Sequence, residues 1–161
     1  MPGGTIYKYH DDLDTDQIIA SQYLLLPDID EMKVHTFESL DPDFPEKVKE
    51  GDFVVGGENF GCGSSREQAP EIIKALGIKC VIAKSFARIF FRNSINNGLL
   101  LIEQPDLYDD MTEGDSITVT VNHHVDYKER QYTIASLPQN LVDIINAGGL
   151  VKAMRKLNGL D

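Results

Sequence analysis

The sequence predicts a mixed α/β fold in one domain, and three patterns support this prediction. Short apolar runs alternate with amphipathic helical patterns in the centre, an alternating apolar–polar run follows, and helical patterns come last. The chain has 161 residues, of which 42% are hydrophobic, which is enough for a buried core. No low-complexity tract or linker-like stretch interrupts the sequence. We therefore expect a single domain over residues 1–161, with a mixed sheet and flanking helices.

The N-terminal third is expected to contain one strand and much irregular chain. Residues 5–9 predict a short strand, and an acidic loop follows over 11–16. Residues 27–50 mix prolines, acidic residues and isolated aromatics, which predicts a long excursion with one short helix. The tripeptide Glu-Gly-Asp occurs at 50–52 and at 113–115, each time before a β-like run, and so predicts two turns.

Strands and helices alternate in the centre of the chain. We expect an apolar strand over 53–55, a helix that ends at Gly77, and a buried strand over 80–83. A second helix ending near Gly98 and a strand over 99–102 complete this unit.

The C-terminal third is expected to be β-rich first and helical afterwards. Alternation over 116–121 predicts a half-buried strand, and 125–134 is expected to return antiparallel to it after a turn at 122–124. Two helical patterns follow, separated by Gly148-Gly149.

Composition limits the partners and the location of the protein. The net charge of -11, from 26 acidic and 15 basic residues, argues against nucleic acid or an anionic membrane as a partner. No apolar stretch is long enough to span a bilayer, and the start of the chain lacks the regions of a signal peptide, so we expect a cytoplasmic protein.

The chain has two cysteines, too few for a disulfide scaffold and too few to ligate an iron–sulfur cluster. We therefore expect reduced thiols and no metal site in this chain. Cys80 lies in an apolar strand and is expected to be inert core, whereas Cys62 lies in a glycine loop and could be exposed and reactive.

Residues 57–70 carry most of the functional information. Gly61 and Gly63 permit positive φ and close approach of a ligand, and they are followed by Ser64, Ser65 and Arg66. Backbone amides at a helix start favour an anion, and a guanidinium can bind a carboxylate in two-pronged fashion. The alternative is structural, because both serines have capping-box spacing to an acid or amide. Spacing alone leaves both interpretations open, although it disfavours a P-loop, since no Gly-Lys-Ser/Thr follows.

Basic residues recur at every fourth position in the second central helix pattern. Lys84, Arg88 and Arg92 would share one helix face, which suits a small anion. A solvated helix face explains the same spacing and is the favoured interpretation.

Two motifs support a family resemblance. The run Gly-Glu-Asn-Phe-Gly-Cys-Gly-Ser-Ser-Arg-Glu, followed by Lys-Ser-Phe-Ala-Arg-Ile-Phe at 84–90, closely resembles the small, swivelling subunit of the aconitase superfamily. The similarity extends from the Asp-Leu-Asp-Thr-Asp run at 12–16 to Asn146 and beyond. The compact size is similar to that of 3-isopropylmalate dehydratase small subunits and their homoaconitase-type relatives. The resemblance implies a swivelling β/β/α domain.

The resemblance also implies half of an enzyme. A separate large subunit would carry a four-iron–four-sulfur cluster, which would serve as Lewis acid for the departing hydroxide of a hydroxy acid. By the same resemblance, Ser64 is the general base, Arg66 with Ser65 binds a substrate carboxylate, and Asp16 orients groups or relays protons. A serine can act as a base only if its alkoxide is stabilised, and the amides of Ser65 and Arg66 at a helix start are expected donors. Without the resemblance, Asp16 is equally a loop carboxylate that caps an amide.

Substrate choice is expected to depend on Leu24, Leu25 and Leu26. Homoaconitase-like relatives carry an arginine at the position of Leu25, where it can meet a third carboxylate. An apolar wall would leave that carboxylate without a partner but would accept an alkyl group. The alternative is that these leucines are core. An alkylmalate is therefore favoured, with 3-isopropylmalate dehydratase as the first interpretation. Small subunits of 2,3-dimethylmalate dehydratase, a citramalate-type isomerase and homoaconitase are the alternatives.

Two other classes remain for comparison. A non-catalytic dicarboxylate-binding module would keep Arg66 but need neither a base nor a partner chain. A stand-alone hydrolase with Ser64 as nucleophile would need a histidine partner, and none of the four histidines lies near the loop in the chain. A homo-oligomer of the chain without its large subunit is also left open.

Overall fold

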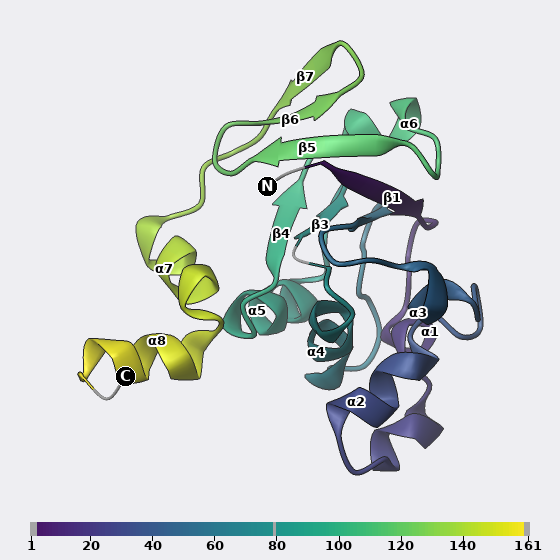
Figure 1. Cartoon of the computed structure of the whole chain (residues 1–161), viewed down its shortest axis with the longest axis vertical. Coiled ribbons are helices and arrows are strands. Elements are labelled where there is room, and N and C mark those ends of the chain that lie inside the picture. The colour runs from purple at the N-terminus through teal and green to yellow at the C-terminus, as the bar shows by residue number, and fades with distance from the viewer. Residues whose placement is uncertain (1–2, 79, 160–161) are drawn as a thin grey trace.

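The computed structural model describes residues 3–78 and 80–159. Within them, seven strands form one sheet in the order β4-β3-β2-β1-β5-β6-β7 (Figure 1). The strands are β1 Gly4–Lys8, β2 Phe53–Gly56, β3 Cys80–Ala83, β4 Leu100–Glu103, β5 Ser116–Thr120, β6 His124–Tyr127 and β7 Arg130–Thr133. The α-helices are α1 Thr15–Ile18, α2 Ile29–Met32, α3 Phe44–Lys47, α4 Gln68–Ala75, α5 Arg88–Asn96, α6 Leu107–Asp110, α7 Gln139–Ala147 and α8 Leu150–Leu157. Two 3₁₀ helices, η1 Ser21–Leu25 and η2 Lys33–His35, lie between α1 and α3.

Strands β1 to β4 form the parallel half of the sheet. They pair in register, with Val54 opposite Val81 and Val81 opposite Leu101. These three side chains belong to a core cluster shared with α4 and α5, which supply Ile72 and Phe90. The two crossover helices therefore cover the same face, as Figure 1 shows.

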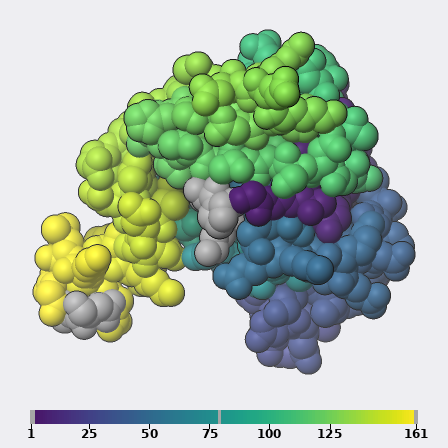
Figure 2. Space-filling model, turned by 45° about the horizontal axis from the view of Figure 1, so that its top comes forward, coloured from purple at the N-terminus to yellow at the C-terminus, as the bar shows by residue number. Residues whose placement is uncertain are grey.

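The antiparallel half covers the other face of the parallel strands. β5 pairs antiparallel with β1, and β6 and β7 continue the sheet. Phe53 and Ile82 of the parallel half share a second core cluster with Ile117, Val119 and Val125 of the antiparallel half. The sheet therefore curls over itself and makes two β layers and one helical layer, which confirms the expected fold class. Figure 2 shows the antiparallel half, in green, as a continuous cover.

The predicted central strands and helices are confirmed, while the excursion and the hairpin differ from expectation. Residues 27–50 contain α2, η2 and α3 rather than one short helix, and the acidic loop ends in α1. Helices of four residues contain a single turn, so no apolar period marks them in the sequence. The stretch 125–134 is two strands, because the chain reverses at Lys128 with φ of 54° and without a glycine.

The C-terminal helices α7 and α8 form an arm beside α5 (Figure 1). Helix α7 ends at Gly148, whose φ of 91° is left-handed, as the glycine pair predicts. Lys74 of α4 holds this end by donating to the carbonyl oxygens of Asn97, at 2.8 Å, and Gly148, at 3.0 Å. Among the described residues, none of the helices combines the length and apolarity that a membrane crossing requires.

Candidate functional site

The glycine loop and the 84–90 motif lie side by side in the structure. The Phe60 amide donates to the Ser85 carbonyl oxygen at 3.0 Å, and the Ala87 amide donates to the Phe60 carbonyl oxygen at 3.0 Å. The Lys84 amide also donates to the Gly57 carbonyl oxygen, at 3.1 Å. These backbone bonds join residues more than twenty positions apart in the chain and so bring the two motifs to one place.

Helix α1 fixes the second part of the glycine loop. The Thr15 amide donates to the Cys62 carbonyl oxygen at 2.9 Å, and the Thr15 hydroxyl donates to the Ser64 carbonyl oxygen at 2.8 Å. Thr15 is 2% exposed, so both bonds are shielded from water. Asp14 caps the same helix in a capping box with Gln17, which fixes its start. The backbone of Ser64 is therefore held by a partly buried contact with Thr15.

Two loop glycines are required by their surroundings. Gly61 has φ of 85°, and a Cβ there would overlap the Phe90 ring. Gly63 has φ of 93°, and a Cβ there would lie 2.6 Å from a carboxylate oxygen of Asp14. Both positions combine a left-handed backbone with a close approach, which only glycine allows.

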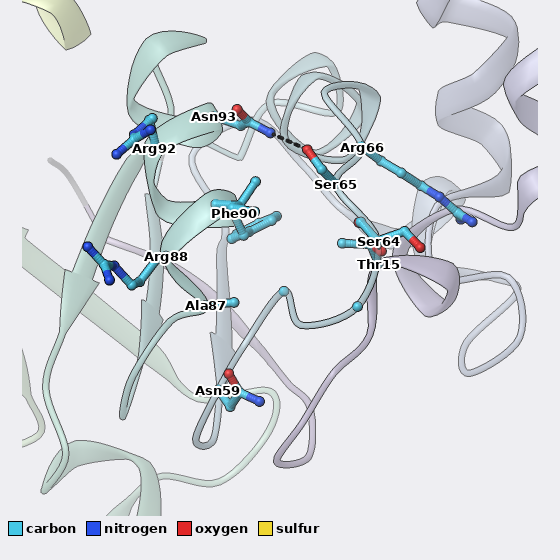
Figure 3. A pocket seen from close by; sticks show the side chains of 13 residues that line it. Thr15, Asn59, Ser64, Ser65, Arg66, Ala87, Arg88, Phe90, Arg92 and Asn93 are labelled. Carbon is cyan, nitrogen blue, oxygen red and sulfur yellow. Dashed lines mark hydrogen bonds between the residues drawn. The ribbon is translucent and has the colours of Figure 1, made fainter.

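The loop and α5 enclose a cavity of about 520 Å³ (Figure 3). Ser64 and Ser65 are exposed, so the cavity opens to solvent. The residues that line it are Thr15, Asn59, Gly61, Gly63, Ser64, Ser65, Arg66, Ala87, Arg88, Ile89, Phe90, Arg92 and Asn93. The structure thus brings Ser64, Ser65 and Arg66 together in one open cavity.

The serines do not cap the helix that follows them. Helix α4 begins at Gln68, and its N-cap Glu67 makes no side-chain cap bond. The Ser65 hydroxyl instead accepts a long hydrogen bond of 3.4 Å from the Asn93 amide group. Within the described part of the chain, the Ser64 hydroxyl has no hydrogen-bond partner, and the amides of Ser65 and Arg66 have no acceptor. The structural alternative of a helix cap is therefore wrong, and these amides precede the helix rather than belonging to its first turn.

The Arg66 side chain is only 11% exposed, and its guanidinium contacts Asp16 of α1 and Ile19, the residue that follows α1. Its guanidinium forms an ion pair with Asp16 and donates to the Ile19 carbonyl oxygen at 2.6 Å. A guanidinium has five N–H donors, so these two contacts leave donors for a further anion. Among the described residues the Asp16 carboxylate accepts from no amide, and Asp14 is the residue that caps α1.

The three leucines lie outside this cavity. Leu24 and Leu26 are partly buried against the core, as the structural alternative predicts for them, while Leu25 is 90% exposed. Of these three leucines, Leu25 is the one whose side chain is largely open to a ligand.

The predicted basic helix face is wrong for Lys84. Lys84 precedes α5 and pairs with Asp109 at 3.1 Å. Arg88 and Arg92 do share α5 and line the cavity, but in Figure 3 their guanidinium groups extend away from Ser64. No acidic partner lies within 4 Å of either guanidinium in the described residues. Both arginines therefore belong to the rim of the cavity.

Burial decides the state of the two thiols. Cys80 is fully buried in β3, and desolvation raises the pKa of its thiol far above the usual range. Cys62 is partly buried, and desolvation, with the nearby carboxylates of Asp14 and Asp12, raises its pKa as well. Neither thiol is thus a ready thiolate ligand. In residues 3–78 and 80–159, no three histidines, cysteines or acids cluster to hold a metal ion.

Sequence reasoning did not single out Thr15, Asn59 or Asn93 as site residues. Asn59 has φ of 55°, and its side chain donates to Asp12 at 3.1 Å. Asn93 reaches Ser65 one helical turn after Phe90. Arg88 and Arg92 are four residues apart, which in the sequence was the one indication that a face of α5 could border an anion site. Nothing in the sequence marks Thr15 as a site residue.

Comparison with known proteins supports the family resemblance. The family model described as the aconitase C-terminal domain matches residues 12–107, more than half of the chain. This chain belongs to the aconitase C-terminal domain family. The matched range contains α1, the glycine loop and the 84–90 motif that packs on the loop.

Relatives within the aconitase C-terminal domain family cover nearly the whole chain. A protein of Lachnospira eligens named 3-isopropylmalate dehydratase small subunit is 65% identical over 158 residues, 98% of this chain and 96% of its own. The 3-isopropylmalate dehydratase small subunit 1 of Archaeoglobus fulgidus is 49% identical over 96% of this chain and 97% of its own. A crystal structure of 3-isopropylmalate dehydratase from Methanocaldococcus jannaschii is 44% identical, with a TM-score of 0.91 over 97% of this chain and 94% of that one.

Proposed function

We propose that this chain is the small subunit of a two-subunit hydro-lyase, a 3-isopropylmalate dehydratase. It would interconvert 2- and 3-isopropylmalate in leucine biosynthesis by removing water and adding it back on the neighbouring carbon. The observation that supports this most directly is the open cavity in which Ser64, Ser65 and Arg66 meet. The names of the full-length relatives point to the same reaction.

Ser64 is proposed as the base that removes a proton from the carbon beside a substrate carboxylate. Its hydroxyl has no competing partner in the described residues, and its backbone is fixed by the partly buried Thr15 contact. The unpaired amides of Ser65 and Arg66 are the proposed donors to the alkoxide. They would supply this stabilisation from the irregular segment before α4 rather than from a helix end.

Arg66 is proposed to bind a substrate carboxylate while it keeps Asp16. The ion pair with Asp16 orients the guanidinium, and its remaining N–H donors would bind the carboxylate of a ligand that enters near Ser64. Asp16, with its side chain 63% exposed, borders the neighbouring cavity and would accept or return a proton beside Arg66.

The cysteines and acids of this chain do not fit an iron–sulfur cluster. Two thiols with raised pKa, one of them inside the sheet, cannot ligate four irons. We propose that the cluster belongs to the large subunit and that this chain supplies binding and proton transfer.

The alkyl group is proposed to contact Leu25. Its exposed side chain would meet the substrate when the large subunit covers the open cavity, whereas Leu24 and Leu26 support it from the core. An apolar contact here excludes a third carboxylate, because that charge would be buried without a partner.

Reconstitution tests the proposal. The lone chain should be inactive, and addition of a cluster-loaded large subunit of the isopropylmalate type should give dehydration of 2- and 3-isopropylmalate. Dimethylmalate, citramalate and homoaconitate assayed in parallel decide between the alternatives. Turnover by the lone chain, or a preference for homoaconitate, would contradict the proposed function.

A further inference from the structure

We propose that Glu38 is a positioning residue, whose carboxylate holds Tyr23 and His35 together and thereby fixes the 21–26 segment. The selectivity of the enzyme for its alkyl group would then depend on a residue outside the cavity that holds Ser64. This inference rests on the proposed function, because the fixed segment presents Leu25.

Glu38 binds two side chains with its two carboxylate oxygens. The Tyr23 hydroxyl donates to Oε1 at 2.5 Å, and the His35 ring bonds Oε2 through Nδ1. The Tyr23 and His35 rings also stack, with centroids 3.7 Å apart and planes 5° from parallel. These hydrogen bonds, that from Tyr23 foremost, lower the pKa of Glu38, so the carboxylate is charged at neutral pH. The three side chains form one unit, the Tyr23–Glu38–His35 clamp.

The core anchors one side of this clamp. Phe37, next to Glu38, is fully buried and stacks on Tyr9 with ring centroids 4.3 Å apart. The Phe37 amide donates to the Ile18 carbonyl oxygen at 3.0 Å, which ties the 35–38 turn to the end of α1. The backbone at Glu38 is therefore held in place by the buried Phe37 beside it.

The clamp holds the segment on its other side. Tyr23 lies in η1, two residues before the exposed Leu25 in the chain. Four residues before Tyr23, the Ile19 carbonyl oxygen accepts a hydrogen bond from Arg66 at 2.6 Å. A cavity of about 260 Å³, bordered by Asp16, Tyr23, His35 and Glu38, lies beside the segment. The Tyr23 ring packs against the core and stacks on His35, and the hydrogen bond to Glu38 adds a directional restraint at its hydroxyl end.

The variant Tyr23→Phe tests the clamp, because it keeps the ring and its stacking on His35 and removes the hydroxyl. We expect faster backbone hydrogen exchange across residues 21–26 in the isolated chain. In the reconstituted enzyme we expect KM for isopropylmalate to rise about three- to tenfold and the preference over citramalate to fall similarly, while kcat changes less than about twofold. Glu38→Gln, which exchanges one acceptor oxygen for a donor, should act in the same direction.

The matched control is Tyr132→Phe. Tyr132 also donates to a carboxylate, that of Asp110 at 2.7 Å, but in the antiparallel half of the sheet. The Tyr132→Phe variant should leave backbone hydrogen exchange at residues 21–26 and the preference for isopropylmalate over citramalate unchanged. Unchanged exchange in Tyr23→Phe, or faster exchange with unchanged selectivity, would overturn the positioning role. If the wild-type pair dehydrates no alkylmalate, the proposed function fails instead, and the exchange measurement still decides whether the clamp exists.

Discussion

The side chains around the cavity differ in how their polar groups are engaged. Arg66 is committed to Asp16 and to the Ile19 carbonyl oxygen, whereas the Ser64 hydroxyl is left unpaired within the described residues. A fixed cation beside a free hydroxyl suits a site in which the charge stays in place and the proton moves.

Replacement of Ser64 by alanine tests that assignment at a single atom. We expect kcat to fall by about 10²- to 10⁴-fold, because a general base contributes about that much. Assembly with the large subunit should persist, as measured by co-elution on size exclusion. Ser136→Ala, at an exposed serine bonded to the Asn122 carbonyl oxygen, is the control. Near-normal turnover of Ser64→Ala would assign the base to another group.

The raised pKa of Cys62 makes a prediction about thiol reactivity. A higher pKa leaves less thiolate at any pH below it, so alkylation of Cys62 should be slower than that of a free cysteine peptide. Its rate should rise as the pH is raised toward that pKa, and Cys80 should react only after unfolding. Mass spectrometry of iodoacetamide-treated protein over a pH series measures both. Equal rates for Cys62 and the peptide at neutral pH would contradict the burial argument.

The sequence predicted which residues meet in the cavity but not the residues that surround them. Ser64, Ser65 and Arg66 were predictable because glycines, hydroxyls and an arginine have a chemical meaning in one short segment. Thr15 acts on Ser64 across 49 positions of the chain through its hydroxyl, and a lone threonine carries no such meaning. The position of Leu25 outside the cavity depends on η1, which the sequence does not mark.

Among the elements, the glycine loop is the one whose backbone the fold constrains most. Gly61→Ala should destabilise the protein by about 1–2 kcal/mol for the left-handed backbone and about 1–3 kcal/mol more for the overlap with Phe90. Gly114→Ala is the matched control, since Gly114 has φ of 93° but no described atom within 4 Å of the place where a Cβ would lie. Urea unfolding should show the larger loss for Gly61→Ala. Equal losses would mean that Phe90 moves aside at little cost.

The sequence predicts the helices that are long enough for an apolar pattern to repeat. Helices α4, α5, α7 and α8 contain eight or nine residues and were expected. Helices α1, α2, α3 and α6 contain four residues each, and of these the sequence predicted only one short helix, somewhere within residues 27–50. Strands β2 to β4 were recognisable because they are apolar on both faces, which is typical of a covered parallel sheet.

For the whole molecule, stability should fall in acid for an identifiable reason. Hydrogen bonds, from Tyr23 first and then His35, lower the pKa of Glu38, and that from Tyr127 lowers the pKa of Asp115. A carboxylate with a lowered folded-state pKa stabilises the fold above its unfolded pKa, about 4 to 4.5. That contribution is lost as the pH falls through the folded value.

Urea midpoints measured from about pH 6 down to about pH 3 check this expectation. The midpoint should drop below about pH 4.5, and the drop should be shallower in Tyr127→Phe, which removes the hydroxyl bonded to Asp115. An equally steep drop in that variant would assign the acid sensitivity to other carboxylates.

Strand β1 is the seam of the sheet, parallel to β2 on one edge and antiparallel to β5 on the other. During synthesis it leaves the ribosome before the other six strands of the sheet, yet its second edge stays unpaired until residues 116 and 117 have emerged. Until then the chain exposes an open strand edge and the bare apolar side of the parallel half, both of which favour aggregation. Fragments that stop before β5 should therefore be insoluble, even though they contain every residue of the cavity.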